Sequence, residues 1–83
     1  MTTALVPVDY AALGQAIEDR RVEIGLDRPW VTLAAGLAKG QLVQIERGNV
    51  TVSARTLARI AGALRTSPDL IRARAERLNG VTS

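Results

Sequence analysis

The chain has 83 residues, of which 47% are hydrophobic, and it contains one Trp, one Tyr and no Phe. This composition suffices for one small helical domain with an aliphatic core and leaves no room for a second domain. Because the chain has no Cys and no His, disulfides, thiolate metal sites and histidine acid–base catalysis are excluded. We therefore expect a protein that is not an enzyme and needs no metal or cofactor, and no small-molecule substrate is evident.

The net charge of +3 is divided unevenly along the chain. Residues 1–27 carry two basic and five acidic side chains, whereas residues 28–83 carry nine basic and three acidic ones. Ten of the eleven basic residues are Arg, whose planar guanidinium can bind a phosphate through two parallel hydrogen bonds. The balance of residues 28–83 suits a nucleic-acid backbone. A bias toward Arg over Lys can also reflect genomic composition.

The ends of the chain are expected to be tails. The apolar stretch at residues 4–8 is too short for a membrane span, and no basic segment precedes it as in a signal peptide. We therefore expect a cytoplasmic protein that does not associate with membranes. The predicted organisation is a single domain over residues 1–83, with its core at about 9–78 and tails at 1–8 and 79–83.

A first helix is predicted from Asp9 to about Gly25. Asp9 is a good N-cap, because its carboxylate can accept hydrogen bonds from the free N–H groups of the first helical turn. Leu13, Ile17 and Ile24 follow at helical spacing and form the face that we expect to point inward.

A second, short helix is predicted at residues 28–35. Asp27 is suited to cap it, and Pro29 is tolerated in its first turn. Gly36 follows at the place where a helix commonly ends in a left-handed residue.

A third helix is predicted at residues 39–47. Leu42 and Ile45 lie one helical step apart and would hold this helix to the core. An amide-rich, weakly basic face would then point away from the core, formed by Lys39, Gly40, Gln41, Val43 and Gln44. Two short helices joined by a turn that begins at glycine make a helix-turn-helix.

Two further helices complete the chain. Ser53 is a good N-cap for a fourth helix, and Ser67-Pro68-Asp69 is a favourable start for a fifth at residues 68–78. The fourth helix is expected to turn inward Leu57, Ile60, Ala61 and Leu64. The fifth carries an apolar stripe of Leu70, Ile71, Ala75 and Leu78.

The central part of the chain resembles the Cro/phage-repressor-like (XRE) family of helix-turn-helix regulators. The likeness covers about residues 13–70 and rests on the spacing of Val31, Ala35, Gly36, Leu37, Leu42 and Ile45. It also rests on the run Leu37-Ala38-Lys39-Gly40-x-Leu42-x-Gln44-Ile45-Glu46, which a glycine and then Ser53-x-x-Thr56-Leu57 follow. The resemblance implies an all-α, compact five-helix bundle of the lambda-repressor-like DNA-binding type, with a central helix-turn-helix.

The resemblance also implies an ion pair and marks two departures. In relatives, an arginine late in the first helix pairs with the glutamate that closes the recognition helix, and Arg21 and Glu46 occupy these positions. The pair is expected to be structural. Ala38 stands where relatives commonly have a Ser or Thr cap, and Arg20 occupies a position that is often apolar.

The resemblance assigns roles at a DNA interface, with the third helix in the major groove. Lys39, Gly40 and Gln44 occupy the positions that most often touch bases in relatives; Lys and Gln side chains can hydrogen bond to base edges, whereas Gly40 allows close approach but reads nothing. The residues expected to bind phosphates are Arg28, Gln41, Arg47, Asn49 and Arg55.

The predicted function is that of a small transcriptional regulator, a repressor, which binds double-stranded DNA in a sequence-specific manner and is associated with the nucleoid when bound. A homodimer is expected, because one recognition helix covers only a few base pairs and two half-sites supply the missing specificity. The apolar stripe of the fifth helix is one possible dimer surface, and packing against the protein's own core is its equal alternative.

A protein-binding adaptor or antitoxin-like module is the alternative function. Trp30 and Leu33 lie three residues apart on the outer face of the second helix, where relatives usually have polar residues. They form either a partner surface or a patch that Leu5, Val6 and Val8 cover, and covering is the favoured of the two. The excess of basic residues in 28–83 opposes the protein-binding alternative.

Overall fold

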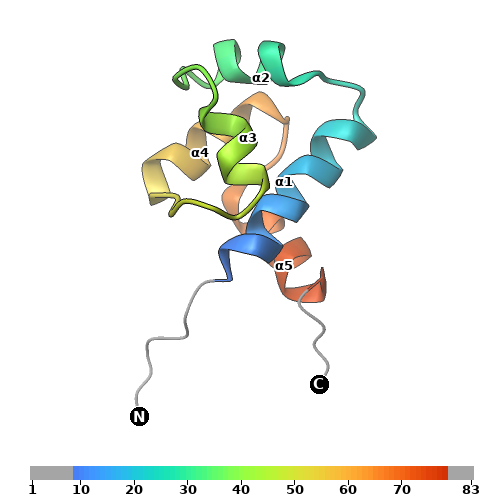
Figure 1. Ribbon diagram of the computed structural model, residues 1–83. Coiled ribbons are helices and arrows are strands. Elements are labelled where there is room, and N and C mark those ends of the chain that lie inside the picture. Colours follow the sequence, from blue (N-terminus) through green and yellow to red (C-terminus); the bar gives the residue numbers. More distant parts are fainter. Residues whose placement is uncertain (1–8, 79–83) are drawn as a thin grey trace.

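The structure, a computed structural model, describes residues 9–78, and within this range it contains helices and no strand (Figure 1). The helices are α1 (Tyr10–Glu23), α2 (Arg28–Ala34), α3 (Gln41–Glu46), α4 (Ala54–Ala63) and α5 (Pro68–Leu78). The predicted all-α, five-helix architecture is confirmed. The expected tails at 1–8 and 79–83 lie outside the described residues, and so do the covering residues Leu5, Val6 and Val8.

Four of these helices begin with a side-chain cap, and at α5 the hydroxyl of Ser67 accepts a hydrogen bond from the N–H of Leu70 at 3.2 Å. The carboxylate of Asp9 accepts a hydrogen bond from the N–H of Ala12 at 3.1 Å, and that of Asp27 accepts one from Trp30 at 3.0 Å. The hydroxyl of Ser53 accepts one from the N–H of Thr56 at 3.1 Å. The predicted caps of α1, α2 and α4 are therefore confirmed, and each satisfies a backbone donor that the helix itself leaves free.

The core is aliphatic and receives side chains from every helix. α1 lies at its centre and packs against both α3 and α5. The largest side chains that are fully buried are Ile17, Val31, Leu42, Ile45, Ile60 and Leu64. Ile24, which was expected to point inward, is only partly buried and packs at the edge of this core.

α3 docks on α1 through a glycine. Gly14 is buried in the middle of α1, and a Cβ atom there would lie 2.6 Å from the carbonyl oxygen of Glu46 at the end of α3. Gly48 fits in a similar way, because a Cβ atom on it would lie 2.6 Å from the Cα atom of Ala11. The end of α3 therefore packs directly against the backbone of α1.

α4 ends in a left-handed turn at Arg65, which has a φ of 59°. The N–H of Thr66 donates to the carbonyl oxygen of Ala61 at 2.9 Å, as in a common helix C-terminal motif. Arg20 of α1 donates from Nε to the carbonyl oxygen of Leu64 at 3.0 Å and from Nη2 to that of Arg65 at 3.1 Å. Arg20 therefore caps α4 from α1, which explains an arginine at a position that is often apolar in relatives.

Candidate nucleic-acid interface

α2, a glycine-containing turn and α3 form the expected helix-turn-helix. At the end of α2, the N–H of Leu37 donates to the carbonyl oxygen of Thr32 at 2.9 Å, and Gly36 between them has a φ of 69°. This backbone conformation strongly favours glycine. Leu42 and Ile45 of α3 are buried in the core, so the other side of α3 faces outward.

The start of α3 differs from the prediction. A helix at 39–47 was expected, but α3 begins at Gln41 because Gly40 is left-handed, with a φ of 80°. The Oε1 atom of Gln41 accepts a hydrogen bond from the N–H of Ala38 at 2.9 Å, while the N–H of Gln41 donates to the carbonyl oxygen of Ala38 at 3.0 Å. The side chain of Gln41 therefore supplies a contact at the turn where Ala38 lacks a capping hydroxyl. Lys39 lies in the turn before α3, and the expectation that it belongs to this helix is wrong.

The side chain of Gln44 is held from the loop that follows α3. The Nδ2 atom of Asn49 donates to the Oε1 atom of Gln44 at 3.0 Å, and the N–H of Asn49 donates to the carbonyl oxygen of Gln44 at 3.0 Å. The structure thus couples a predicted base-reading residue to a predicted phosphate-binding one. The amide group of Gln44 keeps its two N–H donors, and its oxygen has a second lone pair.

Glu46, at the end of α3, is shared by two arginines. Its Oε2 atom lies 2.8 Å from Nε of Arg21, and its Oε1 atom lies 2.7 Å from Nε of Arg28. The carboxylate is 1% exposed, and the expected pair of Arg21 and Glu46 is present. Glu18 completes the network, because its Oε2 atom lies 3.5 Å from Nη2 of Arg28 and 3.9 Å from Nη2 of Arg21. Two arginines thus meet two glutamates at the junction of α1, α2 and α3.

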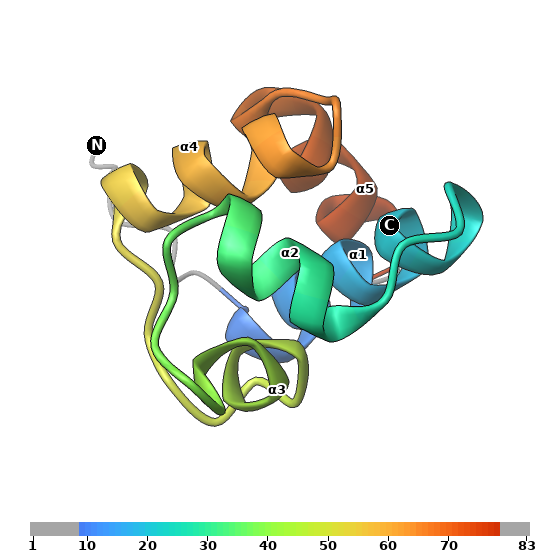
Figure 2. The same cartoon turned by 90° about the horizontal axis from the view of Figure 1, so that it is seen from above.

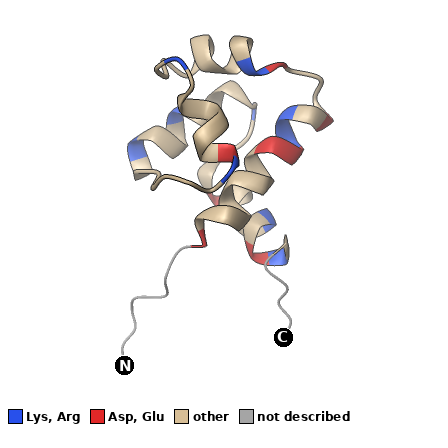
Figure 3. Ribbon diagram, in the orientation of Figure 1, with Lys and Arg blue, Asp and Glu red and all other residues tan. Residues whose placement is uncertain are grey.

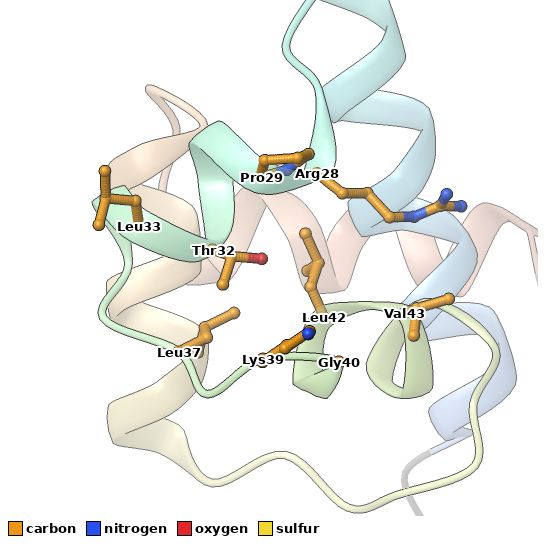
Figure 4. Close-up of a pocket in the computed structure, with 9 residues that line it drawn as sticks. All are labelled: Arg28, Pro29, Thr32, Leu33, Leu37, Lys39, Gly40, Leu42 and Val43. Atoms are coloured by element: carbon orange, nitrogen blue, oxygen red, sulfur yellow. The ribbon is translucent and has the colours of Figure 1, made fainter.

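Arg28 is predicted to bind a phosphate, and in the structure its guanidinium also forms an ion pair with Glu46. Figure 4 shows its side chain extending away from the space between α2 and α3 toward α1. The hydrogen bond to Glu46 raises the pKa of Arg28 above its already high value, so this side chain keeps its charge. Its side chain is 45% exposed, which leaves guanidinium N–H groups open to solvent.

The remaining residues of the predicted DNA interface lie at the surface. Lys39 and Gly40 are exposed in the turn before α3, and Arg47, Asn49 and Arg55 are exposed after it. Figure 3 shows basic residues at both ends of α3 and along α4. The outward side of α3 is therefore bordered by exposed basic groups.

A hollow of about 610 Å³ lies between α2 and α3 beside these residues. Figure 4 shows Thr32, Leu37 and Leu42 around the space between the two helices. Aliphatic side chains dominate the lining, which includes Arg28, Pro29, Thr32, Leu33, Leu37, Lys39, Gly40, Leu42 and Val43. The hollow suits an apolar group next to the recognition helix.

Of the five residues predicted to form a possible partner surface, four are exposed and one is buried. Trp30 is 47% exposed and Leu33 is 84% exposed, and on α5 Leu70 and Leu78 are 63% and 46% exposed. Ile71, which was expected in the same surface, is 2% exposed and packs in the core, so that assignment is corrected. The reason is that α5 turns Ile71 and Ala75 toward α1, as the core-packing alternative predicts.

Sequence reasoning missed two residues that position the interface. Gly14 was not singled out, although a glycine inside a helix signals close approach of another backbone. Glu18 was not singled out either, and nothing in its local pattern indicates that it meets Arg28 of α2.

The fold and this surface define a helix-turn-helix protein of the regulator class, and comparison with solved structures agrees. A crystal structure of the clp gene regulator ClgR from C. glutamicum superposes with a TM-score of 0.85 and 27% identity, over 93% of this chain and 100% of that one. A second structure of ClgR from Corynebacterium glutamicum gives a TM-score of 0.82 and 29% identity, over 87% and 77%.

The restriction-modification controller protein C.AhdI from Aeromonas hydrophila gives a TM-score of 0.73 and 27% identity, over 76% of this chain and 96% of that one. The resemblance to the Cro/phage-repressor-like helix-turn-helix regulators is thereby confirmed. No family model matches the chain, and no curated protein matches it. No helix within residues 9–78 is long and apolar enough to cross a membrane.

Proposed function

We propose that this protein is a small transcriptional repressor that binds double-stranded DNA in a sequence-specific manner as a homodimer. The observation that supports it best is the outward side of α3, held on a rigid helix-turn-helix and bordered by exposed basic residues. The structural neighbours with the same arrangement are a gene regulator and a controller protein by name. We expect the protein in the cytoplasm, associated with the nucleoid when bound to DNA.

Base reading is assigned to Gln44 and Lys39, with Gly40 allowing close approach. The hydrogen bond from Asn49 orients the side-chain amide of Gln44 before DNA binds. The free N–H donors of this amide and the second lone pair of its oxygen suit the hydrogen-bond acceptor and donor at the edge of adenine. Lys39, in the turn before α3, would reach a base edge from the leading end of the helix.

Phosphate binding is assigned to the exposed residues around α3. Arg47, Asn49 and Arg55 are available for it, and Gln41 would contribute only by giving up its hydrogen bond to Ala38. Arg28 would contribute through the N–H groups that Glu46 leaves free. These contacts set affinity and register rather than sequence preference.

A homodimer is proposed because α3 is six residues long and can read only a few base pairs. On α5, the exposed Leu70 and Leu78 offer an apolar surface for a second copy. Two copies related by a two-fold axis would place two recognition helices on a symmetric site.

Protein binding is the second candidate function, and the exposed Trp30 and Leu33 favour it. Together with the apolar hollow between α2 and α3, they form a surface that a partner's side chains could fill. Such a partner would contact α2 and α3 rather than phosphates.

The dependence of binding on salt separates the two functions. For a dimer with roughly six phosphate contacts, the slope of log affinity against log salt concentration is expected near −5. Fluorescence anisotropy of a labelled duplex measures it between about 50 and 300 mM salt, a range in which the Debye length changes strongly. A flat dependence, or no duplex binding at low salt, would contradict DNA binding and favour the protein-binding function.

A further inference from the structure

A second basic site lies away from the recognition helix. An open hollow of about 240 Å³ is bordered by α1, the turn between α4 and α5, and α5. Four arginines line it, together with Thr66 and two aliphatic residues of α5: Arg20, Arg65, Arg74 and Arg77. Figure 2 shows the turn between α4 and α5 and helix α3 at opposite sides of the molecule. The hollow is therefore separate from the proposed DNA surface.

The positive charge of this hollow is not balanced. Glu23 is the carboxylate that the structure places at these arginines, and its Oε1 atom lies 2.9 Å from Nη2 of Arg74 and 3.4 Å from Nη1 of Arg20. Within residues 9–78, Arg65 and Arg77 form no ion pair. Four positive charges thus face one negative charge around a small concave space.

Two of the arginines are held in place by the backbone. Arg20 is fixed by its hydrogen bonds to the carbonyl oxygens of Leu64 and Arg65, which orient its guanidinium without neutralising it. Arg65 has the left-handed conformation that glycine would adopt at lower cost.

The charged residues of α5 lie on two different faces of the helix. Leu70, Arg74 and Arg77 follow at intervals of four and three residues, so they share the face that lines the hollow. Asp69 and Glu76 lie on the opposite face with Arg72, and the guanidinium of Arg72 pairs with Asp69 at 3.1 Å. The acidic residues of α5 are therefore kept away from the four arginines.

We propose that this hollow binds a small anion with at least two negative charges, of the phosphate ester or pyrophosphate class. Guanidinium groups match the geometry of phosphate oxygens, and the hydroxyl of Thr66 adds a hydrogen-bonding group at the same place. The hollow is smaller than the roughly 300 to 1,000 Å³ typical of drug-sized ligands, so a compact charged group fits better than a large one.

The test is a titration of the full 83-residue chain with inorganic pyrophosphate, without DNA, followed by NMR chemical shifts at constant ionic strength. We expect saturable binding with shifts centred on residues 64–77. Arg65→Gly places glycine at a left-handed position that glycine adopts at lower cost, and Arg77→Ala removes an exposed side chain. Both variants should therefore fold. Each is expected to weaken binding by about tenfold, the value of one charge-assisted hydrogen bond. Arg72→Ala, the matched control on the opposite face of α5, should leave affinity unchanged within about twofold.

Three results would overturn the proposal. The first is the absence of saturation, and the second is an equal loss of affinity in Arg72→Ala and Arg77→Ala, which would indicate attraction to positive charge in general. The third is a short DNA duplex that shifts residues 64–77 more than pyrophosphate does, which would make this cluster part of a DNA surface. Because the pyrophosphate titration contains no DNA, its failure says nothing about DNA binding through α3.

Discussion

The molecule contains two arginine clusters that differ in how their charge is balanced. Beside the helix-turn-helix, Arg21 and Arg28 meet Glu18 and Glu46, and the shared carboxylate of Glu46 is buried. At the turn between α4 and α5, four arginines line one hollow, and Arg20 and Arg74 share the exposed carboxylate of Glu23. Ion pairs at the first cluster therefore hold helices together, whereas the excess positive charge at the second is open to an external anion.

Loss of Glu46 should have the largest effect on stability. Glu46→Ala leaves the guanidinium of Arg21 buried without its partner and is expected to cost about 3–5 kcal/mol. Glu76→Ala, on the exposed face of α5, should cost no more than about 0.5 kcal/mol. Urea unfolding of both variants measures the difference.

The double variant Arg21→Met with Glu46→Leu extends the comparison of Glu46→Ala with Glu76→Ala. It should recover much of the loss, because Arg28 is partly exposed and keeps Glu18 within 3.5 Å. Equal stabilities of Glu46→Ala and Glu76→Ala would show that the first cluster does not hold the fold together.

The close packing of α3 against Gly14 of α1 gives the next prediction for the helix-turn-helix region. In Gly14→Ala the new methyl group would meet the carbonyl oxygens of Ile45 and Glu46, so α3 must shift, at a cost of about 1–3 kcal/mol. Gly62→Ala is the matched control, since Gly62 is helical and has nothing within 4 Å of its Cβ position. That control should raise stability by about 0.4–1 kcal/mol. Thermal unfolding that gives both variants the same sign would refute the close approach.

The pH dependence of Glu23 gives the smallest effect and tests the second cluster. The hydrogen bond from Arg74, with its positive charge and a weaker contribution from Arg20, holds the pKa of Glu23 below its usual 4.5. A lowered pKa stabilises the folded state above about pH 4.5, and this stabilisation is lost as the pH falls through the lower folded-state pKa. The melting temperature of Glu23→Gln should therefore lie slightly below that of the parent at neutral pH, and the gap should shrink in acid. A gap that stays constant would show that Glu23 does not pair with the arginines.

Local signals in the sequence predicted most of the fold. The caps Asp9, Asp27 and Ser53 form hydrogen bonds within one helical turn, so their neighbours in sequence define them. The pair of Arg21 and Glu46 is not local, and it was expected only because the chain resembles a family. Ile71 shows the limit of periodicity, since an apolar stripe on α5 does not say which of its residues face the core.

The details of the interface depend on contacts between segments far apart in the chain. Arg28 lies on Glu46 because α2 and α3 pack side by side, which composition and spacing do not reveal. Gly40 is left-handed, so α3 begins two residues later than predicted, and the side chain of Gln41 accepts a hydrogen bond from the N–H of Ala38 at this turn. Arg20 reaches the end of α4 across 44 positions of sequence.

Base reading by α3 is tested most directly by a selection of binding sites from random duplexes with the parent protein, Gln44→Ala and Arg47→Ala. If α3 reads DNA, Gln44→Ala should lose about 1–3 kcal/mol on the preferred site and relax the preference at particular base pairs. Arg47→Ala, which is assigned to a phosphate, should weaken all sequences alike and keep the consensus. A consensus from Gln44→Ala that matches the parent's would contradict base reading by this side chain.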